Sequence, residues 1–267
     1  DAQRQEQVVN ILRRIPYRTS APFLADLADS AESGSVRGAA NRALETLGVP
    51  TDVAPSQLYT SLSEAYYNEQ ADVTNFPNEE FQLVWSFDPG SGLNMTAVRT
   101  EVFHEAMAMR LAERALRLNP NSDEALALWV AANLSREIDS PENYQNPVYP
   151  ASRRSAEYYA VASGAETAQR VLDRALSDRD TRLARRAVSA LERTAGTESL
   201  LYRTDDGVQP MIEALTFPSR RVQYEAALTI ARSQLMEHHR RQDRDRRHLR
   251  DLIQRELLRH RHDREHD

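Results

Sequence analysis

The sequence predicts an all-α fold, in which pairs of short helices stack into an α-solenoid that carries one inserted β-hairpin. Residues 167–232 contain the same unit twice, a short apolar helix, a tight polar turn and a longer Ala-rich helix. Such a unit cannot close a hydrophobic core alone and must stack on neighbours. Apolar residues make up 40% of the chain and charged residues 28%, which fits repeats that each keep one face in water. Alternating apolar residues at 81–87 predict the hairpin.

Composition and charge argue against several classes of protein. Only 8 Gly occur and aromatic residues are scarce, which argues against an all-β or a Gly-rich nucleotide-binding chain. The net charge of −6 argues against general electrostatic binding of nucleic acid. The absence of Cys excludes disulfides, thiolate chemistry and Cys-based zinc sites, and no apolar run reaches transmembrane length. The first residue is Asp1, which indicates a processed or excised chain and no particular compartment.

The N-terminal third is predicted to be helical. Residues 4–15 form a helix that stops at Pro16, residues 21–48 form a helical pair, and residues 54–69 form a further helix. Gly48 is placed to terminate the pair. The apolar stripe expected on the first helix consists of Val8, Ile11, Leu12 and Ile15.

The pair at 21–48 is a third copy of the repeat. The small Ala residues of each copy let paired helices approach closely, while larger residues fill the core between repeats. We align Val36, Ala40 and Ala43 with Leu183, Ala187 and Ala190, and with Val222, Ala226 and the pair Thr229–Ile230.

A β-hairpin is predicted at about 81–98. Apolar side chains alternate on both sides of a turn sequence that runs from Asp88 to Gly92. A lone hairpin is marginally stable in water, so its aromatic face is expected to pack on the helices or on a partner. The alternating residues are Phe81, Leu83, Trp85 and Phe87 before the turn, and Leu93, Met95 and Ala97 after it.

Helical patterns return after the hairpin. A helix over about 100–117 and a second helix, capped by Ser122 or Asp123, form an αα-hairpin. The loop at 140–150 is the best internal boundary, and a helix at 152–162 leads into the repeat pair. The expected domains are residues 1–139, residues 151–234, and an Arg/His-rich charged helical tail at 235–267.

Three stretches, 21–48, 168–196 and 208–232, resemble bacterial HEAT-repeat domain proteins. The segment AERALRLNPNSDEALALWVAANL, residues 112–134, resembles a tetratricopeptide-type (TPR) hairpin. This resemblance implies an α-solenoid that binds other proteins and catalyses no reaction.

A concave surface on the second helix of each repeat is the expected binding site. These helices span 35–47, 181–194 and 220–232, and an Arg-lined groove suits an acidic protein or peptide. The solvent-facing residues expected to line the groove are Arg37, Asn41, Arg182, Arg185, Arg186, Arg220, Arg221 and Gln223.

No cofactor, metal or catalytic site is expected. His104-Glu105 resembles the start of the helical zinc motif H-E-x-x-H, but Ala108 takes the place of the second His. The tail holds six of the seven His, with His262 and His266 four residues apart. A solvated tail explains these His, and ion pairs with Asp explain its Arg residues.

The role of the aromatic residues and the function of the chain each allow more than one interpretation. The aromatic residues Tyr59, Tyr66, Tyr67, Phe81, Trp85 and Phe87 either line a peptide-binding surface or hold the hairpin against helix 54–69, and the second interpretation is preferred. The chain is either a binding scaffold or an oligomerisation element that uses the tail helix 245–260. An enzyme or a nucleic-acid-binding module is a third option, which no motif in the sequence supports.

Overall fold

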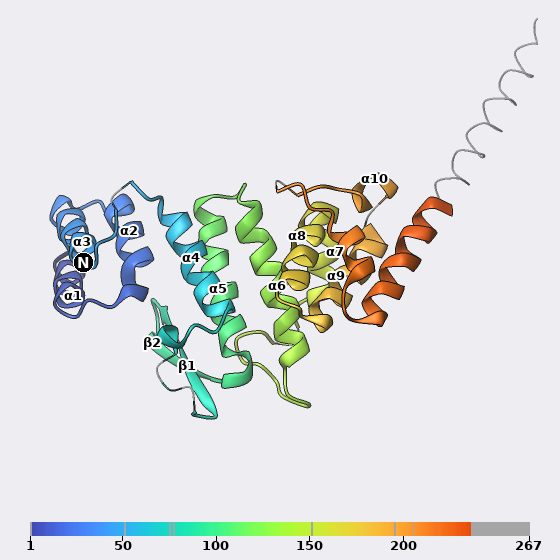
Figure 1. The fold of residues 1–267 in the computed structure, drawn as a ribbon. Helices are drawn as coiled ribbons and strands as arrows, with labels where there is room; N and C mark the ends of the chain where they lie inside the picture. The colour runs from blue at the N-terminus through green and yellow to red at the C-terminus, as the bar shows by residue number, and fades with distance from the viewer. Residues whose placement is uncertain are drawn as a thin grey trace, which may run out of the picture. The chain divides into compact units, whose positions relative to one another are not determined.

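The computed structural model describes residues 2–50, 52–74, 76, 78–150, 152–194, 196–204 and 206–235. In this part the chain is mostly helical and has one small antiparallel sheet, as predicted (Figure 1). The chain forms two compact units, Asp1–Ser163 and Gly164–Asp267. The predicted tail helix and the six tail His residues lie outside the described residues. No described helix has the length and apolar character that a membrane span requires.

The first three helices share one core. On α1 the buried side chain is Val9, whereas Val8, Ile11 and Ile15 of the predicted stripe are exposed. Gly48 ends α3 with a left-handed φ of 69°, as predicted, because glycine adopts this conformation without strain. These helices are α1 (Ala2–Arg14), α2 (Ala21–Ser30) and α3 (Gly34–Leu47), with the 3-10 turn Arg18–Ser20 before α2.

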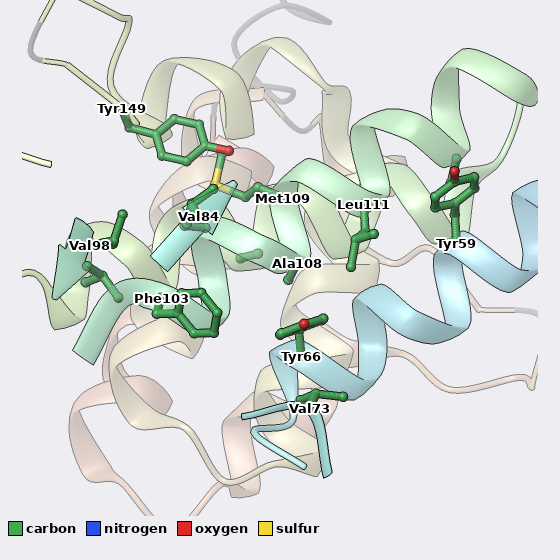
Figure 2. Packing of buried hydrophobic residues seen from close by; sticks show 14 of the residues in the cluster. Tyr59, Tyr66, Val73, Val84, Val98, Phe103, Ala108, Met109, Leu111 and Tyr149 are labelled. Carbon is green, nitrogen blue, oxygen red and sulfur yellow. The ribbon is translucent and has the colours of Figure 1, made fainter. Parts of the chain in front are cut away.

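A second core lies between the hairpin and the helices that follow α3 (Figure 2). Ser122 caps α6 by accepting the Ala125 N–H at 3.2 Å, and Trp129 of α6 donates its indole N–H to Glu113 of α5. Helix α7 packs on α6 and therefore belongs to the first unit. The helices are α4 (Pro55–Tyr67), α5 (Phe103–Leu118), α6 (Asp123–Asp139) and α7 (Ala156–Ala162), with 3-10 turns Ala71–Val73 and Thr100–Val102.

The predicted hairpin is confirmed. Strand β1 (Phe81–Asp88) pairs antiparallel with β2 (Gly92–Arg99), and their register places Phe81 opposite Arg99. The turn closes because Asp88 Oδ1 accepts the N–H groups of Gly90 and Ser91, each at 2.9 Å.

The second unit contains the two tandem copies of the repeat. Their aligned apolar positions are buried, as are those of the copy at 21–48, except for Ile230, which is half-buried beside the buried Thr229. Its elements are α8 (Gly164–Ser177), α9 (Thr181–Thr194), α10 (Thr197–Leu200), α11 (Pro210–Glu213), the 3-10 turn Ala214–Thr216, and helical residues 220–235.

Two ion pairs join the second helices of these copies. Arg185 of α9 pairs with Glu225 at 2.8 Å, and two turns further on Glu192 pairs with Arg232. The partners of each pair are 40 residues apart in the sequence. Because both pairs join residues with the same sequence separation, α9 and residues 220–235 run parallel and in register.

Candidate functional site

The predicted Arg surface of the second unit is partly occupied by internal ion pairs. Arg185 donates to both carboxylate oxygens of Glu225, through Nε at 3.0 Å to each and Nη2 at 2.8 Å to one. Arg221 also approaches Glu225, at 3.5 Å. The amide of Gln223 donates to the carbonyl of Phe217. These three side chains therefore have contacts within the unit. Arg182, Arg186 and Arg220 are exposed on the same helices.

The remaining two predicted residues lie in the first unit. Arg37 and Asn41 are both exposed on α3. The Arg37 guanidinium donates to the carbonyls of Ala31 and Glu32, at 2.7 and 3.1 Å, and so holds the turn between α2 and α3. The eight predicted residues therefore divide between two units, and their role in binding stays a prediction.

His104 has a structural environment. It is buried on α5, where one ring nitrogen contacts the hydroxyl of Thr74 at 3.0 Å and the other contacts the carbonyl of Tyr66 at 3.2 Å. No group of three metal-ligating side chains occurs among the described residues. Both ring nitrogens of His104 are therefore engaged by contacts within the protein.

A large groove of the first unit lies between β1 and helices α2, α4 and α5. Its volume is about 1040 Å³, which is sufficient for a drug-sized ligand or a short peptide. Most of its lining side chains are apolar or aromatic, among them Phe23, Tyr59, Tyr66, Leu83, Trp85 and Leu111.

One wall of this groove is the exposed face of the hairpin. The hairpin packs on α5 through Val84 and Val98, which belong to the second core (Figure 2). The opposite face carries six large apolar side chains, between 45% and 74% exposed, which are Phe81, Leu83, Trp85, Phe87, Leu93 and Met95. Three of them, Phe81, Leu83 and Trp85, line the groove.

The preferred interpretation of the aromatic residues fails for those of the hairpin. Tyr59 and Tyr66 of α4 are buried in the second core, where Tyr59 packs edge-on against Phe23 of α2 and Tyr66 against Phe103 of α5. Phe81, Trp85 and Phe87 are exposed, so they do not hold the hairpin against α4. The alternation at 81–87 defines two faces, and the less apolar face is the buried one.

Three arginines of α5 line the groove beside this apolar wall. Arg110, Arg114 and Arg117 follow one another at intervals of four and three residues, which places them on one side of the helix. Arg110 donates to the main-chain carbonyl of Trp85, and Arg117 lies 3.8 Å from Glu113. These three arginines are not among the residues that the sequence predicts to bind a partner, although their helical spacing can be read from the sequence.

A polar network lies at one end of the groove. Asp26 of α2 is almost fully buried and accepts from Arg114, through Nε at 2.8 Å and Nη2 at 2.5 Å. The same oxygen accepts the hydroxyl of Tyr59 at 3.2 Å. Burial and the nearby Asp26 carboxylate raise the pKa of Tyr59, and burial raises the pKa of Tyr66 to about 12. Both phenols are therefore neutral in neutral solution.

The polar groups of the groove are few and of mixed kind. Beside its apolar walls it is lined by tyrosine phenols, by the guanidinium groups of Arg110, Arg114 and Arg117, and by the carboxylates of Asp26 and Glu79, of which Asp26 accepts from Arg114 and Tyr59. This set of groups is suited to recognition.

No protein-family model, curated protein or solved structure matches the chain.

Proposed function

We propose that this chain is a non-catalytic helical-repeat scaffold that binds another protein, and that its binding site is the groove of the first unit. The observation that carries the proposal is the exposed apolar face of the hairpin beside a groove lined by arginines. Exposed apolar patches of this kind mark interaction sites. Aromatic residues and Arg are also the side chains enriched where proteins bind each other.

The repeat architecture agrees with a scaffold. The parallel, in-register arrangement of α9 and residues 220–235 is what stacked HEAT-like repeats require. We therefore keep the HEAT-like solenoid, with a TPR-like hairpin at α5 and α6, as the proposed architecture. The exposed Arg182, Arg186 and Arg220 remain a proposed second contact surface for an acidic partner.

The proposal is tested by affinity purification from cells of the source organism, with quantitative mass spectrometry of the captured proteins. Trp85→Ala removes an exposed aromatic from the groove. The matched control is Tyr224→Ala, because Tyr224 is a 68%-exposed aromatic residue of the second unit. We expect at least one protein to be captured by the wild type and by the control, and to be lost with Trp85→Ala.

Equal capture by all three proteins contradicts the proposal. Circular dichroism of each variant checks that the fold is retained. Charge reversal of the exposed Arg182 and Arg186 tests the second surface separately, and unchanged capture in that variant removes this surface from the proposal.

A further inference from the structure

We propose that the groove binds its partner as an extended strand, which pairs with the outer edge of β1 and carries alternate apolar side chains and an acidic residue. This inference rests on the proposed function and names the conformation and chemistry of the partner segment. It follows from the main-chain geometry of the hairpin, the location of the groove and the charge on α5.

The main chain of β1 has hydrogen-bonding groups on its outer edge. In an antiparallel ladder, alternate residues direct their N–H and C=O groups away from the paired strand. Glu80 accepts the Thr100 N–H at 3.0 Å, so the even-numbered residues of β1 face β2. The odd-numbered residues Phe81, Leu83, Trp85 and Phe87 therefore direct their main-chain groups outward.

Two further contacts agree with this assignment. The carbonyl of Trp85 accepts from Arg110, which lies on α5 and not on β2. On the other strand, Arg99 is opposite Phe81, and its N–H donates to the hydroxyl of Tyr144 at 3.1 Å. Both contacts reach the hairpin from outside, at residues for which outward main-chain groups are expected.

The groove borders the same edge of β1. Every hairpin residue that lines it belongs to β1, and three of the four are the outward-directed Phe81, Leu83 and Trp85. The groove therefore lies along the outer edge of β1, while Tyr144 contacts the outer edge of β2. An edge strand with outward main-chain groups is a template for a further strand, and many domains bind peptides in this way.

The groove also determines which side chains suit the partner strand. A strand directs successive side chains to opposite faces, so one set faces Tyr66, Leu111 and the other apolar residues of the groove. Valine, isoleucine and leucine suit this set. Arg110 is the arginine best placed for a partner carboxylate, because it contacts a neutral carbonyl, whereas Arg114 is held by Asp26 and Arg117 lies 3.8 Å from Glu113.

A helical partner is the competing possibility. A helix satisfies its main-chain groups internally, so it would use the apolar walls of the groove and make no use of the β1 edge. Main-chain hydrogen bonding by the partner thus separates the two modes of binding.

The test starts from a phage library of random twelve-residue peptides selected on the full chain. Peptides whose binding requires Trp85 are synthesised with a fluorophore, and their Kd is measured by fluorescence anisotropy. We expect alternating aliphatic residues and at least one Asp or Glu. N-methylation of alternate residues removes the donors along one edge of the peptide strand, and we expect one register to weaken binding at least tenfold and the other less than threefold.

Two substitutions in the chain give a matched check. Leu83→Pro removes an outward N–H, and Leu83→Ala keeps it, so we expect the Pro variant to bind at least fivefold more weakly than the Ala variant. Arg110→Gln is expected to weaken an acidic peptide at least fivefold and to leave its Glu→Gln analogue unchanged. If Leu83→Pro fails to fold by circular dichroism, the N-methylated peptides decide the question.

The outcomes separate the two proposals. Peptides that require Trp85 but tolerate N-methylation in both registers overturn strand pairing and leave the proposed function standing. Failure to select any peptide that requires Trp85, together with equal protein capture by the wild type and Trp85→Ala, overturns both. An Arg110→Gln variant that weakens both peptides equally overturns the assignment of the acidic residue.

Discussion

Arg185 and Glu225 form a bidentate ion pair between equivalent helices of two tandem repeats, 40 residues apart in the sequence. The sequence alone predicts that Arg185 faces a partner in a binding groove. In the structure the guanidinium group of Arg185 instead lies between two helices of its own unit. Substitution of Arg185 can therefore measure what the ion pair contributes to stability.

Arg185→Ala is expected to lower the free energy of unfolding by about 1 kcal/mol, because it removes a partly buried bidentate pair. A double-mutant cycle with Glu225→Gln, followed by urea unfolding, should show coupling between the two positions. Arg186→Ala on the same helix is the control and is expected to be nearly neutral. Additive effects of Arg185→Ala and Glu225→Gln would contradict the prediction.

Asp26→Asn is expected to lower the free energy of unfolding by about 2 kcal/mol, because Arg114 loses its charged partner next to a buried site. Tyr59→Phe removes only the hydroxyl that donates to Asp26, so its cost should be about 1 kcal/mol. Thermal unfolding of both variants measures the difference. A larger loss for Tyr59→Phe than for Asp26→Asn would show that the ion pair is not the stronger contact.

Glu105 makes the stability depend on pH. Burial, helped by the nearby carboxylates of Asp139 and Glu69, raises its pKa from 4.5 to about 7, although a main-chain hydrogen bond and Arg136 act in the opposite direction. Its Oε2 has no hydrogen-bond partner. The folded state therefore holds a proton that the unfolded state releases near pH 4.5. The resulting stability is fully present below pH 4.5 and is lost as the pH rises through about 7.

Glu105→Gln should remove this loss. The difference between a pKa of 4.5 and one of about 7 corresponds to on the order of 3 kcal/mol, so the variant should exceed the wild type by up to this amount at pH 8. At pH 4 the two should be similar. Urea unfolding at both pH values measures the difference in free energy of unfolding between the variant and the wild type. The same difference at pH 4 and at pH 8 would contradict the prediction.

Two glycines of the α3 region should respond in opposite directions to alanine. Gly48 has a φ of 69°, so Gly48→Ala is expected to cost about 1 kcal/mol. Gly38 lies inside α3, and a Cβ there would meet only the flexible end of Arg42 at 3.3 Å. Gly38→Ala is therefore expected to stabilise by about 0.5 kcal/mol. Melting temperatures that shift in the same direction for both variants would show that one of these two backbone assignments is wrong.

Local patterns in the sequence are sufficient to predict most of the secondary structure. The periodic apolar residues of the three repeat copies, except the half-buried Ile230, are buried where the alignment places them, and Gly48 ends its helix. The hairpin is predictable because its turn residues and its alternation act within a few residues of each other. The exposed Ile11 on α1 and Ile15 just after it show the limit, since a periodic stripe does not say which of its members another helix covers.

Only the tertiary structure decided which face of the hairpin is buried. The sequence alone favours the face of Phe81, Trp85 and Phe87, yet Val84 and Gln82 are the buried side chains. The compact Val84 fits the core beside α5, and the amide of Gln82 donates to the carbonyl of Phe76, so its burial leaves that donor satisfied.

The sequence by itself thus determined the helices, the repeat and the hairpin, because each depends on residues close together in the chain. The tertiary structure decided the candidate site. It brings β1, α2, α4 and α5 to one groove, and it pairs Arg185 with Glu225 and Arg114 with Asp26 across 40 and 88 residues. Long-range pairings of this kind depend on how the helices pack, and no local pattern of residues specifies them.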